Sequence, residues 1–72
     1  MYREHEVRKK GTLLLKADGN WDYYLYNNTV YSIATDEQCD DGYFGDITHI
    51  RKLVKNGVLT GMMTSIGNEL LK

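Results

Sequence analysis

The stretch that decides the fold is WDYYLYNNTVYSIA, residues 21–34. Two runs rich in Tyr, Val and Ile flank Asn27 and Asn28, and asparagine tolerates the positive φ angles that a two-residue type I′ turn requires. These residues predict a β-hairpin in which Trp21–Tyr26 pairs with Thr29–Ala34. Directly opposed residues in such a hairpin share a face of the sheet.

A third strand is predicted upstream, at residues 12–17. A three-residue loop at 18–20 sets Leu15 opposite Tyr23, whereas a two-residue turn would set Leu15 opposite Asp22. The second register would mix apolar and charged side chains on one face, which costs free energy wherever that face is buried. We therefore expect the three-residue loop and a three-stranded antiparallel meander, with 21–26 in the centre.

This register divides the side chains of the meander between two faces. The predicted core face carries Leu13, Leu15, Ala17, Trp21, Tyr23, Leu25, Val30, Ser32 and Ala34. The opposite face carries Thr12, Leu14, Lys16, Asp22, Tyr24, Tyr26, Thr29, Tyr31 and Ile33. The first set is almost entirely apolar, so we expect it to be the buried one.

The chain after the meander predicts a loop at 35–45 and a helix at about 47–56. Asp46 is a suitable N-cap, and Gly57 is a natural stop. The apolar residues at helical spacing are Ile47, Ile50, Leu53 and Val54. This helix should pack on the core face of the sheet, which makes the fold class α+β.

The C-terminal tail, residues 58–72, leaves two alternatives open. Its apolar residues fit a helical period, but Gly61 and Gly67 each weaken a helix by about 1 kcal/mol relative to alanine. The tail is therefore either a helix or a further strand.

Composition narrows the compartment and the function class. The chain has 72 residues, enough for a single small domain, and nine Lys and Arg against ten Asp and Glu. That balance argues against the strong phosphate attraction of a duplex-DNA binder. The single cysteine, Cys39, excludes an internal disulfide and favours a reducing cytoplasm. No apolar run is long enough for a signal peptide or a membrane span.

The motifs for catalysis and metal binding are absent or wrongly spaced. The acidic residues of the 35–45 loop are Asp36, Glu37, Asp40 and Asp41. They do not match the spacing of a calcium-binding loop, so we expect a solvated loop, with a partner-facing acidic patch as the alternative. Cys39 and His49 have no further residues to complete a nucleophile or a zinc site. We expect no enzyme, no metal and no cofactor.

The tyrosine-rich face is the candidate partner surface. One helix of about ten residues covers one face of a three-stranded sheet but hardly two. The face that it leaves open carries the predicted partner-binding residues Tyr24, Tyr26, Tyr31, Ile33 and Leu14. Tyrosine is enriched in protein interfaces, because it is amphipathic and has few rotamers. The alternative is that the N-terminal arm, residues 2–7, or the tail covers this face.

These observations favour a small non-enzymatic protein-binding module that uses the tyrosine face and an edge strand. Such domains suit inhibitors and adaptors, including those of phages and mobile elements. The strand at 29–34 is an edge of the predicted meander and has no charged side chain, so we expect it to support a homodimer or a complex. The alternative is a single-stranded nucleic-acid binder, in which the tyrosines stack on bases. Its phosphate contacts would come from Arg8, Lys9, Lys10 and Lys16.

Overall fold

The hairpin at Asn27 and Asn28 forms as predicted in the computed structural model, which describes residues 4–71. The two asparagines have φ angles of 52° and 61°, as a type I′ turn requires. Strand β2 (Trp21–Tyr26) pairs with β3 (Thr29–Ala34) in the predicted register along its whole length. The turn chemistry and the apolar pattern therefore specify the same pairing.

Strand β1 (Thr12–Ala17) follows its predicted register over only part of its length. Leu15 lies opposite Tyr23 as expected, but a β-bulge between Leu13 and Leu15 places Leu13 opposite Tyr24. The prediction for residues 12–14 is therefore wrong. The bulge inserts one extra residue, Leu14, into the strand. Leu14 consequently joins Leu15 in the core, although it was predicted on the opposite face.

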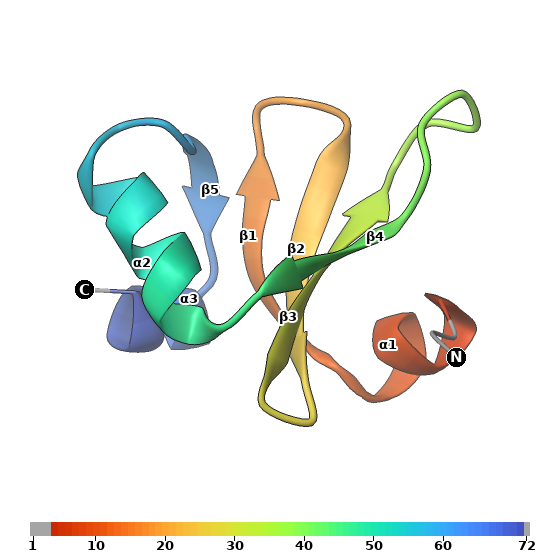
Figure 1. Cartoon of the computed structure of the whole chain (residues 1–72), viewed down its shortest axis with the longest axis horizontal. Coiled ribbons are helices and arrows are strands. Elements are labelled where there is room, and N and C mark those ends of the chain that lie inside the picture. Colours follow the sequence, from red (N-terminus) through yellow and green to blue (C-terminus); the bar gives the residue numbers. More distant parts are fainter. Residues whose placement is uncertain (1–3, 72) are drawn as a thin grey trace.

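Two further strands close the edges of the meander (Figure 1). Strand β4 (Gly42–Gly45) pairs with β3, and β5 (Gly61–Met63) pairs with β1. In residues 4–71 the sheet has the order β4-β3-β2-β1-β5 and is antiparallel throughout. The expectation that β3 is an open edge is therefore wrong. The predicted loop at 35–45 is also wrong at its end, because residues 42–45 form β4. Glycines at both ends of β4 hid this strand, because glycine is depleted in strands.

Helix α2 (Ile47–Lys55) packs on the predicted core face. Asp46 caps it as expected, and its Oδ1 atom accepts a hydrogen bond of 2.9 Å from His49 N. Ile50 is fully buried against the sheet, and the Phe44 ring meets the Tyr23 ring edge-on at 4.9 Å. The buried core cluster on this face consists of Leu14, Leu15, Tyr23, Val30, Ile50 and Leu71. The α+β architecture with a helix on one face is confirmed.

The tail resolves into both of its alternatives, strand β5 followed by helix α3 (Ser65–Leu70). Thr64 caps this helix by accepting a hydrogen bond of 3.0 Å from Gly67 N, and its hydroxyl donates to Leu13 O at 2.7 Å. Arg51 of α2 donates to Leu70 O from both Nε and Nη2, at 3.1 and 2.9 Å. These bonds fasten α3 to β1 and to α2.

A short N-terminal helix, α1 (Glu4–Lys10), lies against β2 and β3 on the tyrosine face (Figure 1). Val7 and Ile33 are fully buried but do not belong to the core cluster on the α2 face. The Arg8 guanidinium donates to Ala34 O at 2.6 Å. The N-terminal arm therefore covers part of the face that the sequence leaves open, which was the alternative expectation.

Candidate protein-binding surface

The predicted tyrosine surface is smaller than expected. Leu14 and Ile33 are fully buried, so the structure places both inside the molecule. Tyr24, Tyr26 and Tyr31 are each half-buried. α1 contributes to this cover, since the Tyr26 hydroxyl donates to Glu6 Oε2 at 3.4 Å. The predicted surface is therefore reduced to three half-buried tyrosines beside a helix.

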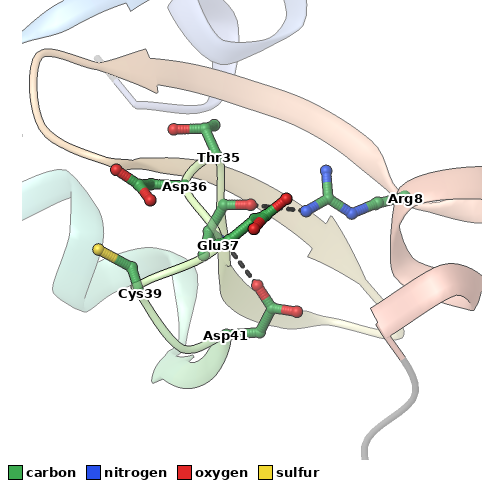
Figure 2. Close-up of a pocket in the computed structure, with 7 residues that line it drawn as sticks. Arg8, Thr35, Asp36, Glu37, Cys39 and Asp41 are labelled. Atoms are coloured by element: carbon green, nitrogen blue, oxygen red, sulfur yellow. Dashed lines mark hydrogen bonds between the residues drawn. The ribbon is translucent and has the colours of Figure 1, made fainter.

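Three residues of the predicted acidic patch, Asp36, Glu37 and Asp41, line a polar cleft of about 360 Å3 (Figure 2). Asp36 and Glu37 are exposed, whereas Asp41 is half-buried and accepts a hydrogen bond from Ala34 N. Figure 2 shows the Arg8 side chain reaching across the cleft from α1 toward these residues. The sequence suggested Arg8 only as a phosphate contact of the nucleic-acid alternative. Its bond to Ala34 O was not foreseen, because 26 residues separate the two.

Two acidic residues of this loop make hydrogen bonds that hold the loop in place. Asp36 Oδ1 accepts a hydrogen bond of 2.9 Å from Gln38 N, which closes a tight turn. The remaining acidic residue, Asp40, is exposed, and its carbonyl oxygen accepts a hydrogen bond of 2.9 Å from Trp21 Nε1. Within residues 4–71, no three His, Cys, Asp or Glu side chains are grouped so as to hold a metal ion.

A different segment carries the most exposed large apolar side chains of the described chain. Val58, Met62 and Ile66 are 67%, 74% and 38% exposed. All three lie in the segment that leads into β5, forms it and leaves it. Met62 and Ile66 belong to the apolar residues of the tail that fit a helical period, for which a helix and a strand were both left open. A strand instead alternates its side chains, so that Met63 packs on the core and Met62 faces outward.

An apolar cleft of about 260 Å3 adjoins Val58, and we refer to it as the Trp21 cleft. Its lining residues are Ala17, Asp18, Gly19, Trp21, Tyr23, Val58, Leu59 and Thr60. Two hydrogen bonds join its walls: Thr60 Oγ1 donates to Asp18 Oδ2 at 2.7 Å, and Asp18 N donates to Thr60 O at 2.9 Å. The lining therefore combines a pair of hydrogen-bonded polar residues with the indole ring of Trp21.

Tyr23 lines this cleft and belongs to the buried core cluster. Its side chain is buried in the core, and this burial raises the pKa of the phenol above its ordinary value, because desolvation disfavours the phenolate. Tyr23 therefore stays neutral at physiological pH and acts as a packing residue.

No protein-family model, curated protein or solved structure matches this chain. No helix within residues 4–71 is both long and apolar enough to cross a membrane.

Proposed function

We propose that this chain is a small, non-enzymatic protein-binding module, and that its binding surface is the outer strand β5 with the residues that flank it. One observation carries the proposal: Val58, Met62 and Ile66 are each exposed, and they lie before, within and after β5 in the chain. Large apolar side chains that a small domain leaves exposed are candidates for a contact surface. We call Val58, Met62 and Ile66 the β5 surface.

The position of β5 in the sheet supports the same proposal. One side of β5 pairs with β1, and no strand within residues 4–71 pairs with its other side. An outer strand with unpaired backbone groups is a site at which a strand of another chain can add. A second copy of the chain could pair here as well, so the proposal includes the homodimer expected from sequence, moved from β3 to β5.

The tyrosine face supports partner binding less strongly than the β5 surface does. Its three rings are half-buried, and α1 already lies over it. The same facts weigh against single-stranded nucleic-acid binding, because stacking needs an accessible ring face. Arg8, one of the expected phosphate contacts, is instead engaged with Ala34 O.

The test is affinity capture with chemical crosslinking from the source cell, with matched bait variants. The bait Val58→Lys/Met62→Lys should lose the captured partner, because it places two charges on the β5 surface. Both side chains are largely exposed, so the melting temperature should change little. The control bait Thr12→Lys/Thr48→Lys adds the same charge at two other exposed positions and should capture normally.

Self-association is measured on the same proteins by sedimentation velocity. Equal capture by all three baits, with an unchanged oligomeric state, would show that the β5 surface is not the binding surface. A wild-type protein that stays monomeric and captures nothing would contradict a protein-binding function. Saturable, salt-sensitive binding to a labelled oligonucleotide would favour the nucleic-acid alternative.

A further inference from the structure

We propose that the Trp21 cleft receives an apolar side chain from a basic peptide segment of the partner. The inference rests on the proposed function, because Val58 belongs both to this cleft and to the β5 surface. It adds what the β5 surface does not specify, namely the chemistry of the segment that binds.

The size and lining of the cleft suit a side chain better than a free small molecule. Its volume of about 260 Å3 lies below the roughly 300–1,000 Å3 of usual small-molecule sites. Trp21, Val58 and Leu59 supply apolar walls of the kind that anchor residues fill in protein interfaces. One large apolar side chain is therefore the occupant that this shape fits.

The indole wall is held in place before any partner arrives. Trp21 Nε1 donates to Asp40 O at 2.9 Å, and the Trp21 side chain packs against the core cluster. The opposite wall is joined to the β1–β2 turn by the two hydrogen bonds between Asp18 and Thr60. A preformed cleft loses less conformational entropy on binding, which favours affinity for a short segment.

The charge around the turn selects a basic segment. Residues 17–50 contain no Lys or Arg, and their acidic residues are Asp18, Asp22, Asp36, Glu37, Asp40, Asp41 and Asp46. Asp18 lines the cleft itself. The acidic loop is fastened beside it, since Thr35 N donates to Asn20 O at 2.9 Å and Trp21 Nε1 donates to Asp40 O.

Lys16 precedes the cleft-lining Ala17 in β1, and because the side chains of a strand alternate, it lies on the face opposite Ala17. Arg8 lines the polar cleft of Figure 2 and bonds to Ala34 O. Lys55 ends α2, three residues before Val58. The basic residues of the bound segment should therefore point toward the β1–β2 turn and the acidic loop. Charge complementarity of this kind contributes specificity and speeds association.

The experiment is a titration of the full-length, 15N-labelled chain followed by NMR. Trp21 is the only tryptophan, so its indole N–H signal reports on the cleft without ambiguity. Three capped peptides serve as probes: KKLKK, KKSKK and EELEE. We expect KKLKK to shift the Trp21 indole and the Val58 and Thr60 amides saturably, and to bind at least about threefold more weakly at high salt. KKSKK and EELEE should produce no saturable shift at these positions.

Two variants separate the roles of apolar contact and charge. Val58→Lys should abolish the KKLKK shifts. Asp40→Asn should weaken binding by about twofold or more, because it removes one carboxylate beside the cleft. Glu69→Gln removes one exposed carboxylate from α3 and should leave the affinity unchanged.

Several results would overturn the inference. Equal binding of KKLKK and EELEE would exclude the charge argument, and Trp21 shifts that follow protein concentration alone would make a second copy the occupant. If no peptide shifts Trp21 while Val58→Lys/Met62→Lys still loses its natural partner, the basic-segment inference fails and the proposed function stands. If that bait keeps its partner while KKLKK binds as expected, the β5 surface fails and the cleft stands.

Discussion

Replacing Gly67 by alanine should destabilise the protein, although the same change stabilises an ordinary helix. Gly67 lies in α3 and packs directly on β1. A Cβ atom there would overlap the Leu14 carbonyl oxygen and would lie 2.9 Å from the carbonyl carbon. Both are backbone atoms of a bulged strand, so neither can move aside by changing a rotamer. Helix α3 has to shift away from β1 instead.

The cost can be worked from the contacts that this shift disrupts. Thr64 bonds to Leu13 O and to Leu14 O, and each hydrogen bond contributes about 1 kcal/mol. Exposing the side chain of Leu71, which is almost fully buried, would cost about 2 kcal/mol more. The higher helix propensity of alanine offsets about 1 kcal/mol of this loss. The net loss is about 3 kcal/mol, a large fraction of the roughly 5 kcal/mol expected for a small domain.

Urea denaturation followed by Trp21 fluorescence and far-UV circular dichroism measures this loss directly. Gly19→Ala is the matched control, because a Cβ at Gly19 meets only the Trp21 ring, at 3.8 Å. That variant should be within about 0.5 kcal/mol of wild type. If Gly67→Ala has the wild-type midpoint or a higher one, α3 does not pack on β1 as described.

The remaining predictions concern α2 and the core. Asp46→Ala should lower the free energy of unfolding by about 1 kcal/mol, because His49 N loses its cap; Asp46→Asn, measured in the same urea series, should retain most of it. Ile50→Ala should cost about 2–5 kcal/mol, since the side chain is fully buried, and an unchanged melting temperature would refute the packing of α2 on the sheet. Burial raises the pKa of Tyr23, so the native state holds this proton more tightly than the unfolded state does. The stabilisation is complete below the unfolded value of about 10 and is lost as pH rises above it. Tyr23→Phe should therefore show a shallower loss of stability above pH 10, and tyrosinate absorbance should lose its late-titrating component.

Local chemistry accounts for the parts of the fold that sequence analysis predicted correctly. The Asn27–Asn28 turn depends on the φ angles of two residues, and the β2–β3 register follows from it. The cap at Asp46 depends on one side chain and a backbone N–H three residues away. Period-two alternation assigned Tyr23 and Val30 to the core face, where both are buried.

The candidate site was less predictable than the fold. The tyrosine surface was inferred from the number of elements available to cover the sheet, and the seven-residue helix α1 had no strong apolar pattern to announce it. The β5 surface was hidden because its apolar residues also fit a helical period. The Trp21 cleft brings residues 17–23 beside residues 58–60, a contact that no local pattern encodes.

By itself, the sequence determined the meander, the helix on its core face and, outside the bulge at Leu14, the separation of that face from the tyrosine face. Each was readable from a pattern within a few residues: a turn, a period-two alternation or an apolar helical stripe. Only the tertiary structure decided the bulge at Leu14, the strands that cover both edges and the placement of α1 over the tyrosines. The physical reason is that unpaired edges and uncovered apolar faces are satisfied by whichever segment can reach them. That choice depends on the geometry of the whole chain, as the Thr64 hydroxyl shows by donating to Leu13 O from 51 residues away.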